Sequence, residues 1–178
     1  MTDTSTTEHT AARRVATAWA GKAPSRAAKS AISVATLGSL VALVLLVAIG
    51  AALHQTVLIP PLAASAALVF AAPALPLAQP RSVVGGQLIS TVVGFIALAM
   101  GGSSLWTAAV AGGLAIGAMG LARAPHSPAA ATSVIVVLTE PAPASFLLLL
   151  LLATAVIVAV GIVVGRSGKT PRYPSYWW

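Results

Sequence analysis

The sequence predicts an all-α integral membrane protein with four long transmembrane helices and two short half-helices that begin at prolines. Of the 178 residues, 58% are hydrophobic and only 7% are charged, and the mean hydropathy is +0.95. A soluble domain carries about 25% charged residues, so this chain has too few charges to coat a water-exposed surface. Apolar runs also recur at roughly the 20-residue length with which a helix spans a bilayer.

Four long apolar segments are expected to cross the membrane as helices. The first begins near Ala31 and stays uncharged to Leu53, whereas the apolar part of a signal peptide has about 7–15 residues. We therefore interpret it as a membrane helix and not as a signal peptide. The four segments cover residues 30–53, 82–101, 103–122 and 143–165.

Two shorter apolar segments, 57–76 and 128–140, lie between the long ones and are bounded by prolines. Proline disrupts the interior of a helix but is tolerated in its first turn, where the missing N–H has no partner in any case. Pro61 and Pro128 are therefore predicted to begin helices. The helical pieces that follow would reach roughly 16 Å, about half of the hydrocarbon core, so they are predicted to be half-helices.

An internal repeat is predicted from the comparison of the chain with itself at an offset of 67 residues, where Pro61 falls on Pro128 and Ser65 on Thr132. Each repeat would hold a long helix, a half-helix and a second long helix, which gives a 3+3 plan. If all three segments cross, the two repeats have opposite orientations, as in many transporters. The same offset also pairs 48–51 with 115–118, Val69 with Val136, Pro76 with Pro143, and Val93-Gly94 with Val160-Gly161.

The basic residues divide the chain into a basic tail (1–29), expected to be mobile, a transmembrane domain (30–165) and a basic, aromatic tail (166–178). Eight of the ten basic residues lie in the two tails. Because cytoplasmic loops are enriched in Lys and Arg, both termini are predicted to face the cytoplasm of a multi-pass cell-membrane protein. This placement favours contact with anionic membrane lipid over nucleic-acid binding as the reason for the net charge of +7.

The number of crossings stays open between four and six. Six crossings place every basic residue inside and Glu140 outside, which agrees with the positive-inside rule. Four crossings, with half-helices that dip in and return, place Arg81 and Arg123 outside, against that rule.

Catalytic chemistry is not expected from this sequence. The transmembrane domain offers one carboxylate, two histidines and no cysteine, so it lacks paired acids and a nucleophile with its base. His54, His126 and Glu140 do not have the helical spacing of known zinc ligands. The sequence therefore predicts neither an enzyme nor a metal or other cofactor.

A binding site for a small anion is predicted at the starts of the two half-helices, because a helix N-terminus presents unpaired N–H groups and a partial positive charge. Arginines inside a membrane domain usually face a cavity or a partner. Interface placement of the arginines and simple capping by His126 are the alternatives. Gly85 and Gly86 are expected to allow close helix packing. The candidate binding residues are Arg81, Arg123, His126, Ser127, Thr132 and Ser65.

Two motifs resemble those of the HPP family of integral membrane proteins. The stretch from His126 to Thr132 reads HSPAAAT and resembles the His-Pro-Pro motif that names the family, although Ser127 stands in place of the first proline. The stretch Pro76-Leu77-Ala78-Gln79-Pro80-Arg81, followed by 85–90, is similar to the family's second signature. The resemblance covers about residues 30–165. It implies a four-helix transporter, and some members of the family are linked with nitrite transport.

The sequence thus predicts a membrane transporter or channel for a small inorganic anion, with nitrite as the implied candidate. A homo-oligomer is expected because one chain of this size encloses little space. The alternative is a non-transporting membrane subunit that scaffolds a larger complex through its tails.

Overall fold

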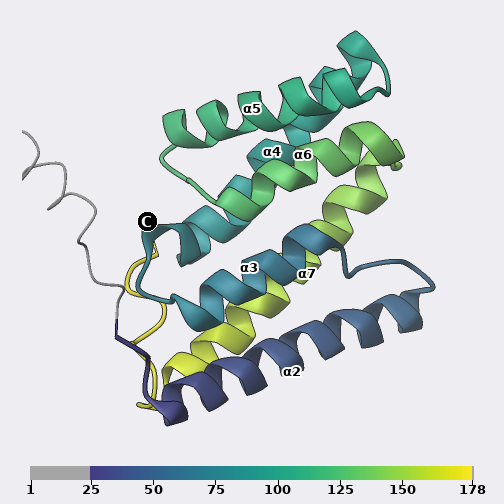
Figure 1. Cartoon of the computed structure of the whole chain (residues 1–178). Coiled ribbons are helices and arrows are strands. Elements are labelled where there is room, and N and C mark those ends of the chain that lie inside the picture. The colour runs from purple at the N-terminus through teal and green to yellow at the C-terminus, as the bar shows by residue number, and fades with distance from the viewer. Residues whose placement is uncertain (1–24, 178) are drawn as a thin grey trace, which may run out of the picture.

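The computed structural model describes residues 25–177 and is all-helical within them (Figure 1). Residues 1–24 of the tail that was predicted to be mobile lie outside the described residues. The helices are α2 (Lys29–Leu53), α3 (Pro60–Ala71), a 3-10 turn η1 (Pro76–Ala78), α4 (Pro80–Gly101), α5 (Leu105–Leu121), α6 (Ser127–Thr139) and α7 (Pro143–Gly165).

Three helices, α2, α4 and α7, are long and apolar enough to cross a membrane. The predicted fourth long helix is not confirmed, because α5 has only 17 residues. It starts late because the Ser104 side chain caps it by accepting a hydrogen bond from the Thr107 backbone N–H. It stops early because Arg123 takes a left-handed conformation with φ of 57°.

The short helices α3 and α6 each begin one residue before the predicted proline. Pro61 and Pro128 are the second residues of helices of 12 and 13 residues. The residues directly before the two helices, Ile59 and His126, both have an extended backbone. A proline fits at this position because the first four N–H groups of a helix have no partner within it.

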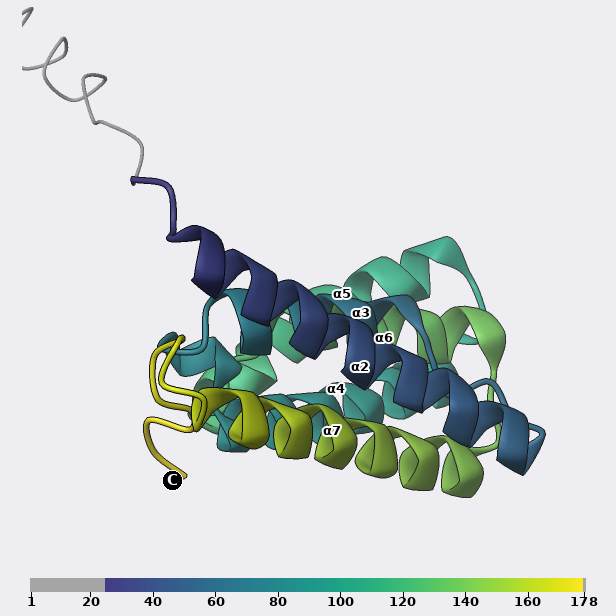
Figure 2. The ribbon, with the colours of Figure 1, turned by 90° about the horizontal axis from the view of Figure 1, so that it is seen from below.

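The chain reverses at each connection, so consecutive helices run in opposite directions (Figures 1 and 2). One end of the bundle gathers the start of α2, the segments 72–79 and 122–126, and the tail after α7. We call this the basic end, because all the described Lys and Arg side chains lie on these segments or at their borders. Glu140 lies at the opposite end. The Lys and Arg residues at the basic end are Arg26, Lys29, Arg81, Arg123, Arg166, Lys169 and Arg172.

The largest apolar core lies between α2, α3 and α7, where Leu46, Leu62 and Ile157 are almost completely buried. The outer faces of the helices are apolar as well. Trp106 is 84% exposed and Leu121 is 89% exposed. Exposed apolar surface on this scale marks contact with a membrane or partner, in agreement with the composition.

Candidate functional site

A cluster of buried polar side chains lies inside the apolar bundle, where α3, α4 and α6 meet. Each of these side chains is at most 1% exposed. An uncompensated polar group is costly to bury, so this density of polar atoms within a membrane-type helix bundle singles out the region. We call it the polar cluster, and its members are Ser65, Gln87, Ser90, His126, Thr132 and Ser133.

His126 precedes α6 and joins three parts of the chain. Its Nδ1 lies 2.7 Å from the carbonyl oxygen of Leu77, in the segment between α3 and α4. Its Nε2 lies 2.7 Å from Oγ of Ser65 on α3. Because a carbonyl oxygen can only accept, Nδ1 carries the hydrogen.

Gln87 on α4 connects the two short helices. Its Nε2 donates to Oγ of Ser65 on α3 at 3.2 Å, and its Oε1 accepts from Oγ1 of Thr132 on α6 at 2.5 Å. A buried amide that uses both its donor and its acceptor in this way fixes the relative position of both helices.

The hydroxyl of Ser65 has more acceptors than it has hydrogens. Its Oγ donates to the carbonyl oxygen of Pro61 at 2.8 Å, and a neutral His126 also needs a donor at Nε2. One hydroxyl hydrogen serves only one of them at a time. A proton added at Nε2 would satisfy both contacts, because His126 would then donate to Ser65.

The helices α4 and α6 pack closely beside this network because small residues face α6. A Cβ on Gly86 would lie 2.6 Å from Cβ of His126, and a Cβ on Gly94 would lie 2.9 Å from Cβ of Val136. Between these two glycines, the Ser90 hydroxyl donates to the Ala129 carbonyl oxygen and accepts from the Ser133 backbone N–H at 3.2 Å. The sequence between Gly86 and Gly94 therefore shapes the α6 side of the cluster.

Three of the predicted binding residues, Ser65, His126 and Thr132, come together in the polar cluster. Of the predicted structural residues, Pro61 and Pro128 lie in the first turns of α3, which carries Ser65, and α6, which carries Thr132. Gly86 supplies the close approach, whereas Gly85 meets only an ordinary contact, with Cβ of Ala124 at 3.4 Å.

The other predicted binding residues lie at the basic end, outside the cluster. Arg81 is half-buried at the start of α4 and donates from Nη2 to the carbonyl oxygen of Ala122 at 3.1 Å. Arg123 and Ser127 are exposed. The structure thus separates the candidates into a buried uncharged group and a second group at the basic end, which holds the half-buried Arg81 and the exposed Arg123 and Ser127.

Sequence reasoning did not single out Gln87, which makes more contacts within the cluster than any predicted residue except Ser65. The available signal was its position, because an amide in the middle of an apolar membrane segment needs a partner across the helix interface.

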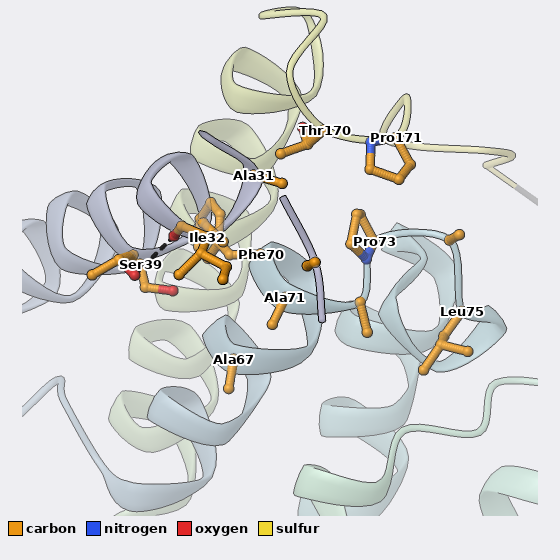
Figure 3. Close-up of a pocket in the computed structure, with 15 residues that line it drawn as sticks. Ala31, Ile32, Ser39, Ala67, Phe70, Ala71, Pro73, Leu75, Thr170 and Pro171 are labelled. Carbon is orange, nitrogen blue, oxygen red and sulfur yellow. Dashed lines mark hydrogen bonds between the residues drawn. The ribbon is translucent and has the colours of Figure 1, made fainter. Parts of the chain in front are cut away.

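A separate cavity of about 690 Å³ opens at the basic end between α2, the end of α3 and the tail after α7 (Figure 3). Its walls are mainly apolar and include Ile32, Phe70 and Leu75. None of the predicted anion-binding residues lines this cavity, so it is distinct from the polar cluster. Among the described residues, no three His, Asp or Glu side chains gather in a way that could hold a metal ion.

Comparison with known proteins shows similarity to a family of transmembrane regions and to two transmembrane proteins. A family model described as "HPP, transmembrane region" matches residues 24–174. A transmembrane protein of Dictyostelium discoideum is 32% identical over 90% of this chain and 56% of its own length. A second transmembrane protein of the same organism is 34% identical over 70% of this chain and 47% of its own length. The chain therefore spans about half the length of these relatives. No solved structure matches it.

Proposed function

Because the chain belongs to the family of HPP transmembrane regions, we propose that it is a membrane transporter or channel for a small inorganic anion, with nitrite as the first candidate. The polar cluster carries this proposal. Polar groups inside a membrane domain are expensive to bury and typically mark the paths of substrates and ions. The amide of Gln87 and the hydroxyls of Ser65 and Thr132 carry hydrogen-bond donors without a fixed charge, which an anion would engage in place of their present partners. Such donors suit a small anion that must also be released.

We propose that the two halves of the chain form the predicted 3+3 inverted repeat. The pattern of substantial helix contacts is unchanged when α2 is exchanged with α5, α3 with α6, and α4 with α7. Thus α2 packs on α3 and α7 as α5 packs on α6 and α4, while α3–α6 and α4–α7 pair across the halves. Since α2 and α5 run in opposite directions (Figure 1), this exchange corresponds to an inverted repeat.

Individual side chains support the same relation. Gly94 of α4 lies against Val136 of α6, and Gly161 of α7 lies against Val69 of α3. The 67-residue offset pairs Gly94 with Gly161 and Val69 with Val136, so these are equivalent contacts that cross between the halves. Ser65 and Thr132, also paired by the offset, both bond Gln87.

In the proposed topology all six helices cross, and the basic end faces the cytoplasm. The short helices α3 and α6 would reach roughly 18–20 Å at 1.5 Å per residue, and the segments 54–59 and 122–126 would complete their crossings. The polar cluster would then lie where the two repeats meet, which is the usual position of the substrate site in inverted-repeat transporters. Rocking of one repeat against the other would expose the cluster to each side in turn.

The test is anion uptake into proteoliposomes by the Thr132→Val variant, with Thr91→Val as its control. Both threonines are almost fully buried, and both lose a hydroxyl of the same size. The Thr91 hydroxyl bonds only the Gln87 carbonyl of its own helix, whereas the Thr132 hydroxyl bonds the Gln87 side chain. We expect nitrite uptake per folded protein to fall about tenfold in Thr132→Val, the equivalent of one lost hydrogen bond, and to stay unchanged in Thr91→Val.

Equal uptake by both variants, at equal amounts of folded protein, would remove the polar cluster from the transport path. Absence of uptake by the unaltered chain, with a panel of small anions, would favour the alternative of a scaffold subunit. A homo-oligomer is also proposed, because the chain is small, and cross-linking in the membrane measures it directly.

A further inference from the structure

The segment that follows α7 is folded onto the basic end of the bundle. Tyr173 is only 3% exposed, and its ring and backbone rest on two glycines of α7. A Cβ on Gly161 would lie 2.9 Å from Cε1 of Tyr173, and a Cβ on Gly165 would lie 2.7 Å from its backbone nitrogen. The Ser175 backbone N–H donates to Oε1 of Gln79 at 2.9 Å. These contacts make the tail a defined wall.

This wall and the last turn of α7 enclose a pocket of about 510 Å³. Two arginines line it, Arg166 directly after α7 and Arg172 one residue before Tyr173. The remaining lining is neutral and includes the hydroxyl-bearing Thr170 and the half-exposed Trp177.

The two arginines have no acidic side chain near them in the pocket. Glu140 is the only acidic residue within 25–177, and it lies at the opposite end of the bundle. Two guanidinium groups beside a hydroxyl, with no acidic side chain among the described residues that line the pocket, suit a phosphate group, which arginine binds with paired N–H donors.

An exposed apolar face of α7 leads to this pocket. Leu148 is 66% exposed and Leu152 is 40% exposed. Arg166 lies 18 residues, or five helical turns, after Leu148 and therefore continues the same face. Acyl chains could lie along this face while a headgroup occupies the pocket, and Trp177 is a typical residue for the membrane interface.

We propose that this pocket binds the phosphate-bearing headgroup of an anionic phospholipid. Arg166 and Arg172 bind the phosphate, the docked tail around Tyr173 forms the wall, and α7 contacts the acyl chains. The proposal does not depend on transport. It requires only that the basic end lies at a membrane surface.

The experiment measures the binding of phosphatidylglycerol, phosphatidylcholine and inorganic phosphate to the full chain in detergent by native mass spectrometry. The double variant Arg166→Gln with Arg172→Gln is compared with Lys169→Gln, which removes a charge from the same tail outside the pocket. A charge-assisted hydrogen bond from each arginine to the phosphate contributes a factor of at least about five to the affinity. We therefore expect the double variant to bind phosphatidylglycerol about 30-fold more weakly, and Lys169→Gln to change the affinity less than threefold.

A further variant, Tyr173→Ala, keeps both arginines but removes the anchor of the wall, and should weaken phosphatidylglycerol binding at least tenfold. Equal losses in the double variant and in Lys169→Gln would show a general charge effect and overturn the proposal. So would unchanged binding in Tyr173→Ala, equal affinity for phosphatidylcholine, or inorganic phosphate that displaces the lipid at millimolar concentration.

Discussion

The Oγ of Ser65 on α3 lies 2.7 Å from Nε2 of His126, the residue before α6, although 61 residues separate them in the chain. The carbonyl of Leu77 holds the hydrogen of His126 on Nδ1, so Nε2 faces Ser65 as an acceptor or, when protonated, as a donor. This contact places the beginning of one short helix against the middle of the other. It is the centre of the proposed anion path and the reason for the first prediction.

The single variants His126→Ala and Arg123→Gln are each expected to lower nitrite uptake, but for different reasons. His126→Ala removes the hydrogen bonds to Ser65 and to the Leu77 carbonyl, so uptake should fall about tenfold or more at any ionic strength. Arg123 is exposed at the basic end, where its charge would raise the local anion concentration, an effect that salt screens.

Flux in proteoliposomes at low and high salt separates these two contributions. The deficit of Arg123→Gln should shrink at high salt, whereas that of His126→Ala should persist. Unchanged uptake in both variants would exclude both side chains from the mechanism.

Replacing Gly86 by Ala is expected to destabilise the protein by about 1–3 kcal/mol, the usual cost of overpacking a close contact. The new Cβ would lie 2.6 Å from Cβ of His126 and 3.1 Å from the Ala124 carbonyl oxygen. Gly85→Ala is the matched control, because its Cβ meets only Ala124 at 3.4 Å and alanine favours a helix over glycine. Thermal unfolding in detergent measures both, and equal midpoints would contradict the predicted close approach of α4 to His126.

Replacing Tyr173 by Phe is expected to stabilise the protein by about 1 kcal/mol. The Tyr173 hydroxyl is buried and has no hydrogen-bond partner within the described residues, and such a group costs about 1–3 kcal/mol. Tyr176→Phe, at a side chain that is 42% exposed, is the control and should have no effect. A loss of stability in Tyr173→Phe would mean that the hydroxyl has a partner.

The same tyrosine predicts a difference at alkaline pH. Burial raises the pKa of the Tyr173 hydroxyl above its ordinary value. The tyrosine of the unfolded chain therefore ionises first, near pH 10. Because only the unfolded state gains from this ionisation, the free energy of unfolding decreases as the pH rises further. The stability of the unaltered chain should fall relative to Tyr173→Phe above about pH 10, as measured by denaturant unfolding.

Six crossings are expected to place Ser103 outside and Ala122 inside, whereas four crossings reverse both. Both residues are exposed in the structure, and the natural chain has no cysteine, so single cysteines report position without background. A membrane-impermeant thiol reagent applied to intact cells should label Ser103→Cys but not Ala122→Cys. Glu140→Cys, outside in both models, and Lys169→Cys, inside in both, are the controls. The reverse labelling of Ser103 and Ala122 would establish four crossings.

Composition and local chemistry determined the class of protein and the approximate positions of its helices. Low charge and long apolar runs exclude a soluble surface, and these are properties of composition that no packing can reverse. Pro61 and Pro128 predicted the two short helices because the conformational limits of proline act within a single turn. The ends of α5 were predicted less well, because the Ser104 cap and the left-handed turn at Arg123 depend on the backbone geometry of single residues.

Only the tertiary structure decided which candidate residues meet. Ser65, His126 and Thr132 could be named from their positions near helix starts. Gln87 lies on another helix within the 85–90 stretch, and its place in that motif does not show that it connects Ser65 to Thr132. The separation of Arg81 and Arg123 from the cluster likewise depends on how the helices pack. Local sequence fixes the conformation within a few residues, whereas contacts between residues 20 to 60 apart arise only when close packing at positions such as Gly86 sets the distance between helices.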